Sequence, residues 1–287
     1  MPIHTQDYRH WDGTLQPEKY KRWWIIAKAE LKLLAQRKII RLIVAVPPVI
    51  YILVHAILIY MFNYLEDAPF PFDEIGGGFF QKFIFSTHPF PSVFLLALVV
   101  VFGGAGLISN DLKHNALSLY LSKPISWVDY LIGKFIAIGV LLASMTLIPG
   151  LLLFLEHALL ADISFFIENF WLIFSIIIYS LVVTTVTSLL MLTFSSLTKN
   201  LRFATIGFCA VWFGLSIIQL ILKQVLQSST VAIVSVWANL ELLGEVLFGL
   251  DRSYNLHLSW TILLLTALTA SCILVLRHRI RAVEIVT

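Results

Sequence analysis

The sequence predicts an all-α integral membrane protein with six transmembrane helices. Of its 287 residues, 59% are hydrophobic and only 13% are charged, whereas a soluble domain carries about 25% charged residues. Six apolar runs are long enough to cross a bilayer, which takes about 20 residues. Lys and Arg gather in alternate connecting segments, a pattern typical of the cytoplasmic side of membrane proteins.

Each apolar run is expected to be a helix, because a backbone surrounded by lipid must satisfy its hydrogen bonds within its own segment. The runs are Ile39–Phe62, Ser92–Ile108, Leu131–Leu155, Phe170–Leu197, Phe203–Leu222 and Leu258–Leu276. The second run is the shortest and lies at the lower limit for a span. Arg41 and Lys134 lie near the starts of their spans, so the interiors of the spans hold almost no charge.

Seventeen of the twenty Lys and Arg residues lie in the N-terminal segment, the 109–134 segment, the 198–202 link and the C-terminal tail. The other three, Lys82, Lys223 and Arg252, fall in the alternate loops, which are acidic instead. This asymmetry predicts that both termini are cytoplasmic and that residues 63–90 and 223–257 face outside.

Residues 1–38 are expected to form a cytoplasmic N-terminus that contains a basic amphipathic helix at 17–38, and residues 39–287 the six-span domain. On this helix Tyr20, Trp24, Ala27, Leu31 and Leu34 share one face, and Lys21, Lys28, Lys32 and Gln36 lie off it. Such a helix would lie along the inner membrane surface with its lysines near lipid phosphates. The alternative is a positive anchor that only fixes topology.

The outer segment 223–257 is half apolar but too broken to form a clean span. One or two short helices that dip back into the outer leaflet, called re-entrant helices, would fit this pattern. Glu241 and Glu245 are four residues apart and so share a helical face. The alternative is a surface helix whose acidic face is solvated.

The sequence offers little support for other functions. Ion- or proton-driven transporters usually need intramembrane carboxylates or histidines, and His55 is the one candidate. His157 and Asp162 match the His-x-x-x-x-Asp pattern of glycerolipid acyltransferases, but they lie on an outer loop, away from cytoplasmic acyl donors. No Gly-x-x-x-x-Gly-Lys-Ser/Thr phosphate loop is present. The net charge of +3 is too small to suggest nucleic acid.

Residues 109–130 are polar yet carry leucines at near-helical spacing, between two spans and on the cytoplasmic side. The expected helix around Asp111–Leu121 would place Leu112, Ala116, Leu119 and Tyr120 on one face, with Asp111, Lys113 and Asn115 bonding to a partner protein. Pro124 would mark the end of the helix. The alternative is an ordinary amphipathic connector that lies on the membrane.

This segment resembles the signature region of ATP-binding-cassette (ABC) exporter permeases of the second type. There the second span runs into an acidic pair, a basic residue, a Gly-Thr step, leucines, Ser-x-Pro and a later Gly-Lys. The counterparts here are Ile108-Ser109-Asn110-Asp111, Lys113, Asn115-Ala116, Leu117, Leu119, Leu121, Ser122-Lys123-Pro124 and Gly133-Lys134. Asn110 replaces an acid and Asn115-Ala116 replaces Gly-Thr.

The resemblance implies a type V exporter-like fold in the bacterial cytoplasmic (inner) membrane. It implies an N-terminal interface helix (Tyr20, Trp24, Lys28, Leu31), a cytoplasmic coupling helix, and re-entrant helices with Glu241 and Glu245. The coupling residues would be Asp111, Leu112, Lys113, Asn115, Ala116, Leu119, Tyr120, Lys123 and Pro124.

The same resemblance implies that the chain is a permease rather than an enzyme, with no cofactor of its own. ATP and Mg²⁺ would bind two copies of a partner ABC ATPase, whose hydrolysis of ATP would drive export. A second permease copy or a sister permease, membrane lipids and accessory proteins would be further partners. The alternative is a membrane scaffold or assembly factor that transports nothing.

Overall fold

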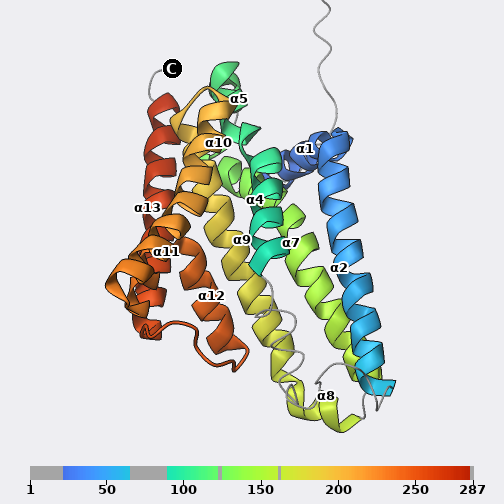
Figure 1. Cartoon of the computed structure of the whole chain (residues 1–287). Coiled ribbons are helices and arrows are strands. Elements are labelled where there is room, and N and C mark those ends of the chain that lie inside the picture. Colours follow the sequence, from blue (N-terminus) through green and yellow to red (C-terminus); the bar gives the residue numbers. More distant parts are fainter. Residues whose placement is uncertain (1–21, 65–88, 122–124, 161–162, 285–287) are drawn as a thin grey trace, which may run out of the picture.

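Six long apolar helices dominate the computed structural model, which describes residues 22–64, 89–121, 125–160 and 163–284. All regular structure in these ranges is helical (Figure 1). The stretches long and apolar enough to cross a membrane are Lys38–Met61, Val93–Lys113, Trp127–Leu160, Trp171–Leu197, Leu201–Leu226 and Leu258–Ile280. The prediction of six spanning helices is therefore confirmed.

Two of the six spans are interrupted, and short helices flank the spans. The spans are α2 (Lys38–Tyr64), α4 (Pro89–Gly104) with α5 (Gly106–Lys113), α7 (Trp127–Leu160), α9 (Trp171–Leu197), α10 (Leu201–Cys209) with the π-helix η4 (Ala210–Gly214) and α11 (Leu215–Leu226), and α13 (Leu258–Glu284). The shorter elements are α1 (Arg22–Gln36), α6 (Ala116–Leu121), α8 (Ile163–Asn169), the 3-10 helix η5 (Ser229–Val234) and α12 (Val236–Leu247).

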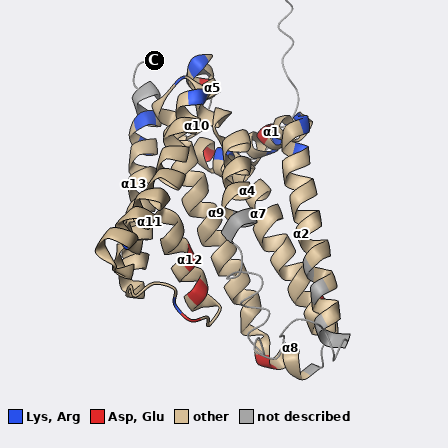
Figure 2. Ribbon diagram, viewed as in Figure 1, with Lys and Arg blue, Asp and Glu red and all other residues tan. Residues whose placement is uncertain are grey.

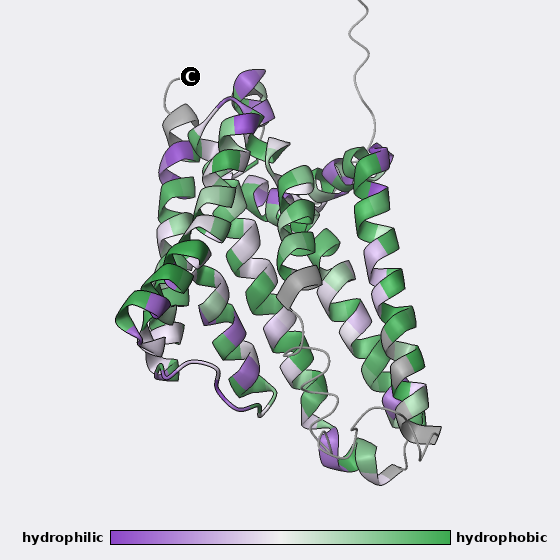
Figure 3. Ribbon diagram, viewed as in Figure 1, coloured by the Kyte–Doolittle hydropathy of each residue, from purple (hydrophilic) through white to green (hydrophobic). Residues whose placement is uncertain are grey.

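Helix α9 lies at the centre of the bundle and packs against α7, α13, α10 and α5. In its most apolar stretch 56% of the residues are buried, against 12% in α2. The outer helices instead expose apolar side chains such as Leu53 and Ile57 of α2. Figure 3 shows this apolar surface between two more hydrophilic ends. An exposed apolar belt of this size suits a multi-pass membrane protein surrounded by lipid.

Helix α7 begins earlier and ends later than the predicted run Leu131–Leu155. Its 34 residues at a rise of about 1.5 Å each make it about 51 Å long, well beyond a hydrocarbon core of about 30 Å.

The early start of α7 has a local cause. The Ser126 hydroxyl donates to the Asp129 carboxylate at 2.7 Å, and the Asp129 N–H donates to Ser126 Oγ at 3.1 Å. This reciprocal cap starts the helix before the apolar run begins.

Helix α1 lies across the ends of the spanning helices at one end of the bundle (Figure 1) and packs against α7. The predicted apolar face is partly wrong. Ala27 and Leu34 are buried as expected, but Trp24 is 48% exposed and Ile26 is buried instead. The physical reason is that α1 is packed on protein, along positions that include Ile26 and Ala27. Lys28 is exposed, Leu31 is half-buried, and Tyr20 lies outside the described residues.

Charged residues separate between the two ends of the bundle. Figure 2 shows Lys and Arg near α1, the tip of α5 and the end of α13, and acidic residues on α8 and α12 toward the other end. The separation places the N-terminal helix, the predicted coupling segment and the end of the last span on the same basic side of the structure.

Candidate functional site

The predicted coupling helix is two short helices rather than one. Helix α5 ends at Lys113, α6 begins at Ala116, and Asn115 between them has a φ of 53°. Asn tolerates this left-handed conformation better than most residues. The turn breaks the helical register, so the prediction that Leu112 and Tyr120 share one continuous helical face is wrong.

A buried charged cluster lies directly beneath this turn and joins α1, α5 and α7. The Lys134 ammonium nitrogen lies 2.5 Å from Glu30 Oε1 and 2.6 Å from Asp111 Oδ2. The Tyr130 hydroxyl donates a hydrogen bond to the same Asp111 oxygen at 2.7 Å. We call Glu30, Asp111, Tyr130 and Lys134 the Lys134 joint. It brings together three helices that are far apart in the sequence.

Helix α6 is attached to the same joint through an aromatic ring. The Lys134 nitrogen lies 5.3 Å from the centre of the Tyr130 ring and 5.8 Å from that of Tyr120. Burial raises the pKa of the Tyr120 hydroxyl above 10.0; Lys134 opposes this rise, while Asp111 and Glu30 add to it. Tyr120 therefore stays a neutral ring against the ammonium, which favours the cation–π contact.

Burial makes the Lys134 joint energetically important. The Lys134 side chain is 1% exposed, and those of Glu30 and Asp111 are 12% and 16% exposed. A buried ammonium is costly unless it is paired. Removing one partner of a buried pair typically costs about 3–5 kcal/mol, because the remaining charge has lost its counter-charge. The joint therefore fixes how α1 and α5 sit against α7.

Gly133 lets α1 come close enough for this contact. A Cβ atom at Gly133 would lie 2.7 Å from Ile26 Cβ and 2.9 Å from the carbonyl oxygen of Trp23. No side chain fits there without moving the backbone of α1. The Gly-Lys pair at the start of the third span thus has two roles, since Gly133 admits α1 and Lys134 binds it.

The predicted coupling residues are divided between the joint and an exposed tip. Asp111 belongs to the joint, where Lys134 and Tyr130 bind its carboxylate, and the Tyr120 ring lies against the joint's ammonium. The expectation that Asp111 also bonds to a partner protein stays a prediction. Lys113 and Asn115 are exposed, and Leu112 and Ala116 are half-buried. The Leu119 side chain, Lys123 and Pro124 lie outside the part of the chain that is described.

Sequence analysis missed Glu30 and Tyr130 and placed Lys134 at a span start without a partner. A signal for Glu30 was present. It is the one acidic residue between Arg22 and Arg41, and it lies four residues from both Ile26 and Leu34. An isolated acid on the packed face of a basic helix indicates a buried cationic partner.

The segment 223–257, which was predicted to face outside, contains η5 and α12, and its two acids face protein. Glu245 is 4% exposed and accepts hydrogen bonds from the Ser253 hydroxyl and, at 3.0 Å, from the Ser253 N–H. Glu241 accepts a hydrogen bond from the Tyr254 hydroxyl at 3.2 Å. Burial raises the pKa of Glu241 above 4.5. The alternative of a solvated acidic face is therefore wrong for Glu245.

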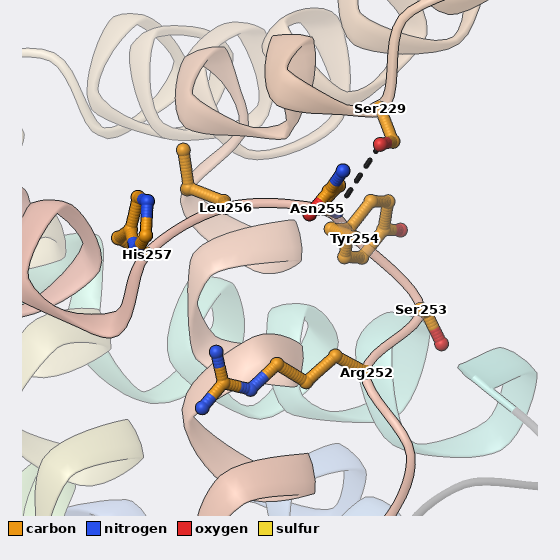
Figure 4. A pocket seen from close by; sticks show the side chains of 7 residues that line it. All are labelled: Ser229, Arg252, Ser253, Tyr254, Asn255, Leu256 and His257. Carbon is orange, nitrogen blue, oxygen red and sulfur yellow. Dashed lines mark hydrogen bonds between the residues drawn. The ribbon is translucent and has the colours of Figure 1, made fainter.

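A cavity of about 300 Å³ lies where the segment 223–257 meets the start of α13 (Figure 4). It is lined by Ser229, Arg252, Ser253, Tyr254, Asn255, Leu256 and His257. The Asn255 N–H donates to Ser229 Oγ at 3.1 Å across its edge. The lining is mostly polar, whereas small-molecule sites are mostly apolar. The Lys134 joint, with its buried charges and its link to an exposed tip, is the better candidate site.

One comparison with known proteins bears on this geometry. Residues 24–234 match the family model described as "ABC-2 family transporter protein". The matched range begins in α1, contains the whole Lys134 joint and ends with η5. No curated protein matches the chain.

Proposed function

Because the chain belongs to the ABC-2 family of transporter proteins, we propose that this membrane permease of an ABC transporter exports a substrate by using the ATP hydrolysis of a separate ATPase. ABC-2 membrane proteins generally partner with an ATPase subunit. The observation that carries the proposal is the Lys134 joint. A partner protein could bind the basic end of the bundle, and the joint would connect that partner rigidly to the spans.

The proposed route of coupling begins at the exposed tip formed by Lys113, His114 and Asn115. Force applied there reaches Asp111 within the same helix, α5. It then passes through the ion pair to Lys134 and into α7, which runs about 51 Å through the bundle. Glu30 ties α1 to the same point, so the two predicted ATPase-contacting elements would move together.

We place the basic end in the cytoplasm of a bacterium and the chain in its inner membrane, with both termini cytoplasmic. Residues 1–38 would form the cytoplasmic N-terminus with its interface helix, and residues 39–287 the permease domain. The segment 223–257 would be re-entrant at the outer face. The charge distribution supports this orientation, because basic residues remain on the cytoplasmic side.

The energy would come from two ATPase copies bound to a pair of permeases, either two copies of this chain or this chain and a sister. ATP and Mg²⁺ would be held by the ATPases. The absence of a Gly-x-x-x-x-Gly-Lys-Ser/Thr loop from the sequence supports this division of labour.

Purification of the chain with its native associated proteins tests the proposal. We expect an ABC ATPase in a ratio of one per permease, with ATP hydrolysis in the complex and none in the isolated chain. Association with non-ATPase proteins alone would contradict the proposal and favour the scaffold.

A further inference from the structure

The second span is interrupted at Ala105, between α4 and α5. In a continuous α-helix each N–H donates to the carbonyl four residues earlier. Here the N–H groups of Ile108 and Ser109 both donate to the hydroxyl of Ser195, at 3.1 and 3.0 Å. Ser195 belongs to α9, the central helix of the bundle. A side chain from one span thus supplies the acceptor for two backbone groups of another.

The same hydroxyl also satisfies the carbonyl on the other side of the interruption. Ser195 Oγ donates to the Ala105 oxygen at 2.8 Å, and the Ser109 hydroxyl donates to that oxygen at 2.7 Å. A hydroxyl has one donor and two acceptor positions, and Ser195 uses all three. Insertion of a side chain into the hydrogen-bond ladder is a recognised cause of sharp helix kinks.

Burial means that the Ser195 hydroxyl has no ready substitute. All the residues that supply these groups are 0% exposed: Ala105, Ile108, Ser109 and Ser195. An unsatisfied buried donor or acceptor costs about 1–3 kcal/mol. Without this hydroxyl, the backbone groups at the interruption have to find their partners within their own helix.

The glycines beside the interruption hold it tightly against α7 and α9. A Cβ atom at Gly104 would lie 2.8 Å from Met191 Cγ and 2.9 Å from Ile138 Cδ1. The membrane part of the span, α4, is therefore fixed between its neighbours. Helix α5, beyond Ala105, is the part that carries Asp111 into the Lys134 joint.

Two hydrogen-bond arrangements satisfy these groups. In the observed one, Ser195 is inserted between the Ala105 carbonyl and the N–H groups of Ile108 and Ser109. In the other, Ser195 would donate to the carbonyl four residues earlier in its own helix, as buried serines commonly do. The Ser109 N–H would then donate to Ala105 and close the ladder. Two satisfied arrangements of one element are what a conformational switch requires.

We propose that Ser195 is a positioning residue for transport, whose inserted hydroxyl keeps the second span open at Ala105 and so sets the direction of α5. This inference rests on the proposed function, because it is the coupling to an ATPase that makes the direction of α5 matter. When Ser195 withdraws, the ladder closes and α5 turns about Ala105, which moves Asp111 relative to Lys134 while α4 stays in place against α7.

The size of the swing can be estimated. Helix α5 has eight residues and is about 12 Å long at about 1.5 Å per residue. A kink of about 20° would displace its far end by about 4 Å. Electron paramagnetic resonance between spin labels at the exposed residues Lys113 and Arg279 would detect this displacement. The full-length chain, with Cys209 and Cys272 replaced by alanine, would be measured in lipid nanodiscs.

Ser195→Ala is the test variant and Ser196→Ala its matched control. Ser196 is also buried, but its hydroxyl donates at 2.7 Å to Thr193 within its own helix. We expect Ser195→Ala to shift the nucleotide-free distance by about 4 Å, and Ser196→Ala to match the wild type. If Ser195→Ala is not monodisperse, Ser195→Gly, which also lacks the hydroxyl, should show the same shift.

The nucleotide response separates this inference from the proposed function. The nucleotide test is made once the chain labelled at Lys113, a residue of the proposed docking tip, is shown to retain its ATPase. In that complex ATP, Mg²⁺ and vanadate should shift the distance in the wild type and in Ser196→Ala, but not in Ser195→Ala. If no ATPase joins the unlabelled chain, the proposed function fails, while the nucleotide-free comparison still decides the role of Ser195. Wild-type distances in a folded Ser195→Ala or Ser195→Gly chain would overturn the inference.

Discussion

Lys134 of α7 and Asp111 of α5 form a buried ion pair, with 2.6 Å between Nζ and Oδ2, directly beneath the exposed turn that connects α5 to α6. The pair places a spanning helix in direct contact with the segment predicted to bind an ATPase. Glu30 binds the same ammonium from α1. The proposed coupling of the ATPase to the spans depends on this arrangement.

Removing the ammonium should destabilise the permease. Lys134→Met leaves the carboxylates of Glu30 and Asp111 without their counter-charge, which should lower the free energy of unfolding by about 3–5 kcal/mol. Thermal unfolding in detergent measures the change. Lys113→Met is the control, because Lys113 is exposed at the same end. Equal unfolding midpoints for the two variants would show that the joint does not stabilise the fold.

Adding one methyl group at Gly133 should push α1 away from α7. The new Cβ atom would lie 2.7 Å from Ile26 Cβ, and such overpacking typically costs about 1–3 kcal/mol. Gly214→Ala is the matched control, since a Cβ atom there meets nothing within 4 Å. Unfolding midpoints of both variants give the comparison. A Gly133→Ala chain as stable as Gly214→Ala would mean that α1 does not pack as described.

Reversing a charge at the exposed tip should weaken ATPase binding and leave the membrane fold intact. Lys113→Glu changes the charge that a docked ATPase would meet, and like charges across an interface disfavour docking. A loss of about 1.4 kcal/mol would weaken the complex tenfold. Titration of the ATPase against the permease in nanodiscs measures this. Arg279→Glu, on α13 at the same end, should bind normally; unchanged binding by Lys113→Glu would remove the tip from the interface.

The segment around α12 should become less stable as pH rises, because of Glu241. Burial raises the pKa of this carboxyl above 4.5, so the folded protein prefers the protonated form. The unfolded chain ionises first as pH increases, and the folded state loses stability until its own pKa is passed. Unfolding midpoints measured from below pH 4.5 upward should fall more in the wild type than in Glu241→Gln. Parallel pH profiles for the two proteins would show that this carboxyl is not desolvated by the fold.

The six spans could be predicted because length and hydropathy alone decide whether a segment crosses a bilayer. The early start of α7 was not predicted, because it depends on the reciprocal cap of Ser126 and Asp129, which lies outside the apolar run. The turn at Asn115 was harder to predict from the sequence. Asn is common in ordinary helices as well as in left-handed turns, so the residue type did not settle the conformation.

The Lys134 joint could not be assembled from the sequence. Asp111 lies near the end of α5, Lys134 lies near the start of its apolar run, and Glu30 lies in a basic helix expected on the membrane surface. In all three places a charged side chain ordinarily reaches water or lipid headgroups. Only the packing of α1 against α7 at Gly133 brings the three together and buries them. Long-range packing decides such contacts, and local periodicity does not say which residues of different helices meet.

The most direct test of coupling through the Lys134 joint is the movement of α7 when ATP binds. Leu159, near the end of α7 that lies away from the joint, and Leu263 on α13 are both exposed. Spin labels at these two residues would report this movement in the permease–ATPase complex in nanodiscs. The account predicts that ATP, Mg²⁺ and vanadate shift this distance in the wild type. It predicts no shift in a monodisperse Lys134→Met complex that still holds its ATPase. An equal shift in both complexes would contradict the account, because force would then reach α7 without the joint.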